Sequence, residues 1–418
     1  MKRFDAEHHL KTVILPYWNA LKDTEYGGFY GFKTYDLAVQ KKADKGVILH
    51  SRILWFYSNV YLTIGGAENL ANARHAYEFI VKRCFDTERG GIYWMVSYDG
   101  VPADTTKNAY NQAFCIYALA SYYRASGNAE ALRRAYSLFE CIETYCADEY
   151  GYLEAFGADW KTPVESAICD QGVAAEKTMN TLLHVLEAYT ELFSADSHPL
   201  VGKKLTRILR IVCERVFNPE FERLETFFDA RMKPLADIHS YGHDIEAAWL
   251  LDRAAEVLTR DVERGSAAAC APFADDVRAA ARAVAECTPR IARKILAIAY
   301  DGQALNNESR GEAAAANAAS VGKNLGVRVD TERIWWVQAE SVVGFVNEYG
   351  KSGDENFLSA ARQIYSYIEN TLVDKRPGSE WFWSVSKDGE ASRHGITEPW
   401  KCPYHNGRMC VELIRRGY

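Results

Sequence analysis

Twelve segments of the chain show helical apolar periodicity, and the connections between them alternate between short and long. The segments are residues 4–22, 46–64, 68–85, 106–125, 129–147, 172–193, 199–217, 242–260, 270–299, 331–350, 355–373 and 401–416. Tight turns, such as those at Ile64-Gly-Gly-Ala and Ser126-Gly-Asn-Ala, supply the short connections. This alternation predicts an all-α fold in which six helical hairpins close into a double ring, an (α/α)6 barrel.

The long connections carry short segments in which a turn signal is followed by alternating aromatic and β-branched residues. These segments begin at Glu25, Glu88, Glu149, Arg223, Asp301 and Gly378. A turn residue followed by such an alternation is typical of a small β-hairpin. We therefore expect a single domain over residues 1–418, with short β-hairpins in the long loops at one mouth of the barrel.

In an (α/α)6 barrel the second helix of each pair is inner and begins at the mouth. The inner helices would be residues 46–64, 106–125, 172–193, 242–260, 331–350 and 401–416. Their first turns carry polar and aromatic side chains within apolar segments, namely Arg52, Tyr110, Asn111, Asn180, His184, His243, Glu246, Trp249, Trp336, Glu340, His405, Asn406 and Arg408. Buried groups of this kind need partners or a ligand, so we expect them to converge on one pocket.

Each candidate also has a structural explanation. A single histidine in a helix is more often a hydrogen-bonded core residue than a catalyst, which is the interpretation given to His50, His75, His198 and His394. On spacing alone, Glu246 and Glu340 are as well explained as ion-pair partners. Trp335 and Trp336 are adjacent, so we expect only one of them to face inward.

Composition narrows the function classes. The 418 residues carry 49 Lys and Arg against 56 Asp and Glu, a formal charge of −7, which argues against nucleic acid bound through a basic face. No apolar run is long enough to span a membrane, and the N-terminus does not resemble a signal peptide, so we expect a cytoplasmic protein with no membrane partner. The ten cysteines form no CxxC pair, and we expect no metal site.

The chemistry is narrowed further by aromatic content and by missing motifs. Aromatic residues make up 13% of the chain, and rings with polar edges are typical of carbohydrate sites. The GxGxxG, GxxxxGK(S/T), GxSxG and HExxH patterns are absent from the sequence. Two histidines across a pocket suit proton transfer to and from carbon near neutral pH. Glycoside hydrolysis by paired carboxylates and non-catalytic sugar binding remain alternatives.

Five segments, in order along the chain, carry a family resemblance. They are residues 42–56 (KADKGVILHSRILWF), 177–180 (KTMN), 237–246 (DIHSYGHDIE), 335–340 (WWVQAE) and 400–410 (WKCPYHNGRMC). Together they resemble the cellobiose 2-epimerases of the N-acylglucosamine 2-epimerase superfamily, over nearly the whole chain. Members of this family fold as (α/α)6 barrels and need no nucleotide or redox cofactor, so the resemblance implies no cofactor here.

The resemblance also implies roles for individual residues. His243 and His405 would be the acid/base pair, with Glu246 orienting and polarising His243. His184, with Asn180 and Arg52, would handle the ring oxygen and the O1/O2 edge of the reducing sugar. The remaining binding residues would be a hydrogen-bonding Tyr110 and the stacking platforms Trp336 and Trp400, with Trp249 and Glu340 completing the binding shell.

The implied reaction is epimerisation at C2 of the reducing-end sugar of β-1,4-linked disaccharides, such as cellobiose or a lactose-like substrate. The sugar ring would open, one histidine would remove the C2 proton, and the other would return a proton to the opposite face of a cis-enediolate. An aldose–ketose isomerase and an N-acylglucosamine 2-epimerase are alternatives within the superfamily. The acidic surface is compatible with a monomer or a homodimer.

One segment departs from the family pattern. An Ala-rich insertion at about residues 308–330 lies just ahead of Trp335 and is longer than the usual loop. We expect a mobile loop there, with a lid that shapes the outer sugar's subsite as the alternative.

Overall fold

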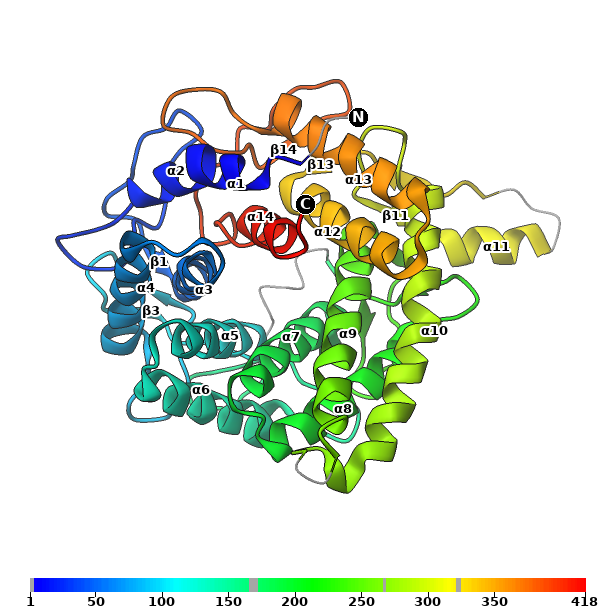
Figure 1. Cartoon of the computed structure of the whole chain (residues 1–418), viewed down its shortest axis with the longest axis horizontal. Coiled ribbons are helices and arrows are strands. Elements are labelled where there is room, and N and C mark those ends of the chain that lie inside the picture. The colour runs from blue at the N-terminus through cyan, green and yellow to red at the C-terminus, as the bar shows by residue number, and fades with distance from the viewer. Residues whose placement is uncertain (1–3, 165–171, 266–267, 321–324) are drawn as a thin grey trace.

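The inner helices form a closed ring in this computed structural model, which describes residues 4–164, 172–265, 268–320 and 325–418 (Figure 1). The inner helices are α3 (Val47–Ile64), α5 (Ala109–Ser126), α7 (Met179–Asp196), α9 (Tyr241–Val262), α12 (Trp335–Ser352) and α14 (His405–Arg415). Each packs against the next, and α14 packs against α3, which closes the ring. The predicted (α/α)6 barrel and its inner set of helices are therefore confirmed.

Outer helices cover this ring. They are α1 (Ala6–His9) with α2 (Leu15–Asn19), α4 (Ala67–Phe79), α6 (Ala129–Cys141), α8 (Pro199–Ile211), α10 (Ala274–Ile298) and α13 (Glu355–Tyr367). Wider π-helical turns occur at Leu10–Ile14, Ile80–Cys84, Ile142–Cys146, Val212–Val216 and Ile368–Leu372. Each of the twelve predicted helical segments thus has its counterpart in the structure.

Burial explains why the two rings differ in sequence. In α3 every residue from 47 to 60 is buried, because this helix contacts its ring neighbours, its outer partner and the residues at the barrel axis. A helix that is apolar on nearly all faces is stable only in such surroundings. The outer helix α8 instead buries one stripe, which includes Val201, Leu205 and Leu209.

Short strands form a belt around the mouth. Five inner helices are directly preceded by a strand: β1 (Lys45–Gly46), β4 (Lys107–Asn108), β6 (Lys177–Thr178), β10 (Ile238–Ser240) and β13 (Arg333–Ile334). Each pairs antiparallel with a strand from the next long loop, namely β2 (Met95–Val96), β5 (Ala155–Phe156), β9 (Phe227–Phe228), β11 (Glu308–Arg310) and β14 (Ser384–Val385). The belt therefore joins consecutive repeats.

Local hairpins, which the sequence predicted for all long loops, account for only part of this pairing. They include the pairing of β7 (Phe217–Asn218) with β8 (Arg223–Leu224). Within the described ranges, β3 (Pro102–Asp104) pairs with β2 and β12 (Arg328–Asp330) pairs with β11, and each adds a third strand to the belt. The belt also explains why α7 begins at Met179 and not at residue 172: Lys177 and Thr178 already pair with β9.

The Ala-rich insertion differs from its expected form as a mobile loop. Residues Glu312–Ser320 form the helix α11, which projects from the edge of the ring in Figure 1. Alanine has the highest intrinsic helix propensity, which favours a helix here. The Asp237 carboxylate accepts a hydrogen bond from the Ala314 amide at 3.0 Å, which anchors the first turn of α11 beside β10.

Two further expectations concern the chain as a whole. No helix among the described residues combines the length and apolar character needed to cross a bilayer. The nine cysteines in the described ranges are free thiols, most of them buried. The tenth, Cys169, lies outside the described residues.

Candidate active site

A cavity of about 310 Å³ opens at the mouth, where the inner helices begin. Its volume lies at the lower end of the range typical of small-molecule sites. The predicted site residues that line it are Arg52, Tyr110, Asn180, His184, His243, Glu246, Trp336, Trp400 and His405. All six inner helices or the residues just before them contribute to its wall, so the structure brings these side chains to one place.

Two predicted binding residues lie behind this wall. Trp249 is buried and donates its indole N–H to Glu340 Oε2 at 3.1 Å. Glu340 is likewise buried, and neither side chain lines the cavity. Trp335 and Trp336 both line it, although the sequence predicted that only one of the two would face inward. Residues at the start of a helix project over its end, so adjacent side chains can reach the same space.

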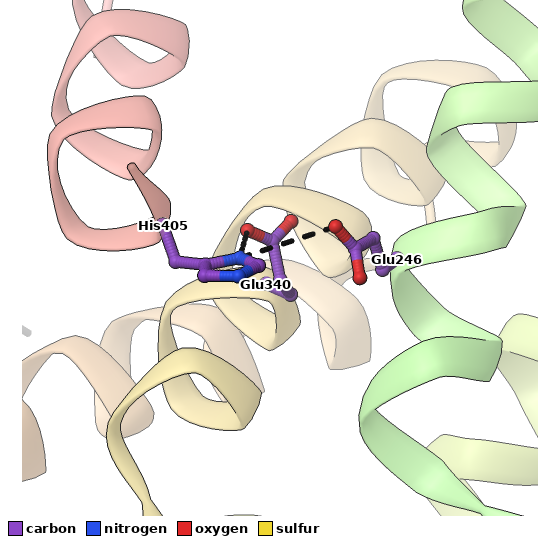
Figure 2. Close-up of side chains that lie close together, drawn as sticks. All are labelled: Glu246, Glu340 and His405. Atoms are coloured by element: carbon purple, nitrogen blue, oxygen red, sulfur yellow. Dashed lines mark hydrogen bonds and ion pairs between the residues drawn. The ribbon is translucent and has the colours of Figure 1, made fainter. Parts of the chain in front are cut away.

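His405 is held by a carboxylate (Figure 2). Its Nδ1 lies 2.8 Å from Glu340 Oε1 and 3.9 Å from Glu246 Oε1. When Nδ1 donates to a carboxylate, the tautomer is fixed and Nε2 becomes the acceptor. The imidazole of His405 can therefore present a basic nitrogen to the cavity that it lines.

His243 has a different partner from the one predicted. Its Nδ1 lies 2.8 Å from Ser240 Oγ, whereas Glu246 contacts Arg408 and approaches His405. The role of Glu246 in orienting His243 is therefore not supported by the geometry. Glu246 lies nearly one turn further along α9, and from there its carboxylate reaches the barrel axis and the residues of α14.

Trp336 lies against both histidines. Its ring centroid is 4.6 Å from that of His243 and 5.6 Å from that of His405. Since all three side chains line the same cavity, the two imidazoles border one shared space beside an indole face. Such a face is suited to packing against the C–H groups of a sugar.

Arg408 links the carboxylates beneath the cavity. Its guanidinium is buried and donates to Glu187, Glu246 and Glu340, the last at 2.7 Å. The hydroxyl of Tyr404 also contacts both Arg408 and Glu187. One arginine thus faces three buried carboxylates, and Coulombic interactions are strong between buried charges.

These carboxyl groups have divergent pKa values. Burial opposes the ionisation of Glu187, but Arg408 and His184 outweigh it and lower the Glu187 pKa to about 2. Burial and the neighbouring Glu340 raise the pKa of Glu246 to about 7. Burial also raises the pKa of Glu340 to about 6, against the effect of Arg408. Groups with opposed shifts in one pocket are typical of acid/base sites.

Both histidines at the shared space are neutral at pH 7. Burial lowers the pKa of His243 to about 3. Burial, together with Arg408 and Arg52, lowers the pKa of His405 well below its usual value. A neutral imidazole with an unprotonated nitrogen can accept a proton from a substrate carbon.

Arg52 carries a charge without a carboxylate partner among the described residues. It is only 2% exposed, and it donates to the Tyr110 hydroxyl at 2.8 Å and the Trp400 carbonyl at 3.3 Å. Its Nε has no hydrogen-bond partner. A buried guanidinium at a cavity wall without an anionic partner is suited to stabilising a negative charge on a ligand.

A metal ion does not fit the one cluster of ligand types that the described residues form. Oxygen or nitrogen atoms of Glu246, Glu340 and His405 lie within 4.8 Å of one another. The guanidinium of Arg408 already donates to both carboxylates, and His405 Nδ1 binds Glu340 as well. A divalent cation placed there would face an arginine at hydrogen-bond distance, which is strongly unfavourable.

Comparison with known proteins decides the family. The family model described as N-acylglucosamine 2-epimerase matches residues 27–407. The chain belongs to this family. It is 49% identical to a cellobiose 2-epimerase of Ruminococcus albus, over 99% of this chain and 98% of that protein. A cellobiose 2-epimerase of Eubacterium cellulosolvens is 41% identical, over 100% and 99%.

Solved structures agree with this assignment. A sugar epimerase from a ruminal bacterium matches with a TM-score of 0.89 at 48% identity, covering 99% of this chain and 98% of the other. A D-mannose isomerase matches with a TM-score of 0.75 at 18% identity, covering 98% and 97%, which shows a common fold. The protein is thus a carbohydrate 2-epimerase, an enzyme of the isomerase class.

Several residues of this epimerase escaped the sequence prediction. His184 Nδ1 lies 2.9 Å from Glu187, which follows it by three residues, the same spacing that separates Glu246 from His243. Arg408 stands at the same spacing from His405; the sequence predicts it at the pocket but does not indicate its contacts with three carboxylates. Trp383 also lines the cavity, and it lies in a Gly-aromatic segment that was assigned only to a hairpin.

Proposed function

We propose that the epimerase acts at C2 of the reducing-end sugar of β-1,4-linked disaccharides, converting cellobiose to 4-O-β-D-glucosyl-D-mannose and accepting lactose-like substrates. The observation that carries this proposal is the pair His243 and His405, two neutral imidazoles from α9 and α14 that lie against one indole at the mouth. The name of the relatives at 49% and 41% identity supports cellobiose as the sugar.

The reaction begins when the sugar ring opens, because only the aldehyde acidifies the C2–H bond. One histidine accepts that proton, the C1–C2 bond gains double-bond character, and a cis-enediolate forms. The other histidine, after taking up a proton from solvent, donates it to the opposite face of C2, and the carbonyl at C1 is restored. The first histidine releases the C2 proton to solvent, so both imidazoles return to the neutral form and no net proton is gained or lost.

Charge in this transition state develops on the sugar oxygens. Arg52 lines the cavity without a carboxylate partner among the described residues, so its guanidinium is free to bind the O1/O2 edge. A well-placed donor to such an oxyanion contributes about 3 kcal/mol to catalysis. Asn180 Oδ1 also lacks a partner at the cavity wall and can accept a hydroxyl of the sugar.

The carboxylates under the site stabilise the protonated histidines. When His405 gains a proton, it faces Glu340 at 2.8 Å and Glu246 at 3.9 Å. His184 is held by Glu187 in the same manner and approaches Tyr110, with ring centroids 4.9 Å apart. In the proposed reaction His184 acts at the ring-oxygen edge of the sugar, where a donor assists ring opening.

Incubation of cellobiose with the purified enzyme in D₂O tests the proposal. We expect a disaccharide with mannose at its reducing end and deuterium at C2, and the rate should not change when EDTA is added. A ketose product would instead indicate an aldose–ketose isomerase. Release of glucose would indicate hydrolysis. Turnover of N-acylglucosamine and not of cellobiose would indicate an N-acylglucosamine 2-epimerase.

The variants His243→Asn and His405→Asn test the two-histidine mechanism separately. Each should reduce epimerisation by about a thousandfold or more, while each keeps C2–H exchange with only one of the two epimers. Proton NMR of C2–H washout measures this directly. The exposed His198 caps α8, and Asn can also cap a helix, so His198→Asn serves as the matched control and should be fully active. Retention of full epimerisation by either site variant would contradict the mechanism.

A further inference from the structure

A buried basic residue stands shortly before each inner helix, and it attaches that helix to the loops of the mouth. The six residues are Lys45, Lys107, Lys177, His239, Arg333 and Lys401. Four of them bind the aspartate that opens the preceding turn, in the pairs Lys45–Asp23, Lys107–Asp86, Lys177–Asp148 and Arg333–Asp301. Lys401 binds Glu380 at 2.7 Å.

The fourth repeat breaks this pattern at both positions. Asn218 stands where the other turns have aspartate, and its Oδ1 accepts the amides of Glu220 and Phe221 as those aspartates accept theirs. Its side-chain amide carries no charge. The basic residue of this repeat is His239, the one member of the six that can lose its proton near neutral pH.

His239 finds its acids elsewhere. Its Nε2 lies 2.9 Å from Asp244 Oδ2, and its Nδ1 lies 3.1 Å from Glu312 Oε1. A neutral imidazole has one N–H donor, so only the protonated ring can donate to both carboxylates at once. Glu312 is the first residue of α11, so the Ala-rich insertion provides an acid that the turn at Asn218 lacks.

This ion cluster lies beside the catalytic site. His239 belongs to β10, and the next residue, Ser240, binds His243 Nδ1 at 2.8 Å. Asp244, which follows His243, also accepts the amide of Leu224. Ser240 directly follows His239, and His243 directly precedes Asp244, which His239 binds. His239 therefore holds both ends of the segment that contains the Ser240–His243 hydrogen bond.

We propose that Glu312, His239 and Asp244 form a clasp through which the Ala-rich insertion positions Ser240 and His243 for proton transfer. The inference deepens the proposed function, because it rests on His243 acting at C2. His239 and Glu312 do not line the cavity and are positioning residues, not catalytic ones. The clasp gives the insertion a role in the rate of the reaction.

Other charged groups around the clasp keep their charge while His239 titrates. Arg223 on β8 binds Glu312 at 3.5 Å, Asp237 at 2.9 Å and Glu225 at 3.2 Å. Burial opposes ionisation of Glu312, but His239 outweighs it and lowers the Glu312 pKa to about 2. The ring centroid of Tyr241 lies 4.9 Å from that of His239, and burial raises the pKa of the Tyr241 hydroxyl, which therefore stays neutral.

The proton on His239 is retained well above neutral pH. Burial disfavours the charged ring, but Asp244 and Glu312 outweigh burial and raise the His239 pKa to about 9. Above that pH the ring keeps one N–H and can donate to only one of the two acids. We therefore expect the hold on Ser240 and His243 to loosen on the alkaline side of neutrality.

Glu312→Gln tests the clasp, because it removes one charge and little volume. At pH 7.5 kcat for cellobiose should fall about tenfold while KM stays within twofold, since misplacement of a proton-transfer group affects the chemical step. The alkaline limb of the kcat profile should move to lower pH by about one unit. NMR titration of His239 should show the same change.

Asp301→Asn is the matched control, since it removes the acid from the equivalent pair in another repeat. An arginine does not lose its proton in the accessible pH range. We therefore expect this variant to lower Tm without moving the alkaline limb. The NMR signals of His243 should shift in Glu312→Gln and stay in place in Asp301→Asn, a readout that needs no turnover.

The proposal is overturned if Glu312→Gln lowers Tm yet leaves kcat, the alkaline limb and the His243 signals as in the parent. His239→Gln is a second variant, and it should abolish the alkaline limb. An inactive parent would count against the proposed function, whereas an active parent with an unaffected Glu312→Gln variant would count against the clasp alone.

Discussion

Arg408 is the residue on which the charged interior depends. Its guanidinium is the shared donor to Glu187, Glu246 and Glu340, and through two of them it supports His184 and His405. An arginine suits this place because its fork of N–H groups can donate in several directions at once. Three carboxylates at the barrel axis would otherwise repel one another in a medium that screens charge weakly.

Arg408→Met should therefore destabilise the fold. Removal of one partner from a buried ion cluster leaves charges uncompensated, which costs about 3–5 kcal/mol. Urea unfolding at pH 7 measures this loss. Arg415 is partly exposed and binds Asn59 and Thr63, so Arg415→Met should cost about 1 kcal/mol or less. Equal losses in both variants would contradict the central role of Arg408.

The loss of activity at low pH, the acidic limb of the kcat profile, should reflect protonation of the carboxylates under the site. Glu340 provides a negative charge that stabilises protonated His405 only when it is ionised, and burial raises the Glu340 pKa to about 6. The kcat profile should therefore rise between about pH 6 and 7, although both histidines are already neutral there. Initial rates in overlapping buffers test this expectation.

Glu246→Gln separates this explanation from titration of a histidine. Loss of the like charge beside Glu340 favours the ionised form of that carboxyl, so the acidic limb should move to lower pH. The variant should also be slower, because His405 loses one of two nearby carboxylates. If the acidic limb of Glu246→Gln stays at the pH of the parent, a group other than Glu340 must be titrating.

The composition of the site could be predicted from the sequence, but its pairing could not. Polar and aromatic residues in the first turns of apolar helices identified eight of the lining residues, because such groups are buried only with partners or a ligand, and the family resemblance added Trp400. The partner of His405 depends on which helix lies opposite, since this histidine binds Glu340 of α12. His243 binds Ser240 of β10, three residues before it, whereas helical spacing favours Glu246, three residues after it.

At the scale of elements, the inner helices approach closely where glycine permits it. A Cβ added at Gly344 of α12 would lie 2.8 Å from the Ile245 carbonyl oxygen of α9 and 2.5 Å from a side-chain carbon of the same residue. A backbone atom cannot move aside without shifting the whole helix. Because α9 and α12 carry His243 and Trp336, this contact also sets the width of the site between them.

Gly344→Ala should lower the free energy of unfolding by about 1–3 kcal/mol, the usual cost of overpacking. Gly350→Ala is the control on the same helix, where the added methyl group meets nothing within 4 Å. That change should be neutral or stabilising by up to about 1 kcal/mol, because alanine favours helices. Chemical denaturation of the two variants side by side measures the difference.

Helices were predictable from the sequence because local periodicity encodes them, whereas strand pairing was not. β1, β4, β6, β10 and β13 consist of two or three residues each, and their partners lie in the following long loop. Pairing over such separations leaves no local pattern. The insertion shows a related limit: a mobile loop was predicted where the structure has the helix α11, and the contact of Glu312 with His239 depends on a segment far away in the sequence.

For the whole molecule, ring closure joins the two ends of the chain. α14 packs between α12 and α3, and α1 from the N-terminal segment packs on α14 (Figure 1). The strand belt adds links between consecutive repeats at the mouth. A ring closed in this way has no free edge from which one repeat could unfold without exposing the faces of its two neighbours.

Unfolding of the whole chain should therefore be a single transition, as expected of one domain over residues 1–418. Gly407 lies at the seam between α14 and α3, where an added Cβ would meet the Phe56 ring at 2.5 Å. If the ring is one cooperative unit, Gly407→Ala should lower Tm by several degrees in one step, with the calorimetric and van't Hoff enthalpies still in agreement. Differential scanning calorimetry distinguishes this from an early, separate transition, which would mean that α14 leaves the ring while the other repeats stay folded.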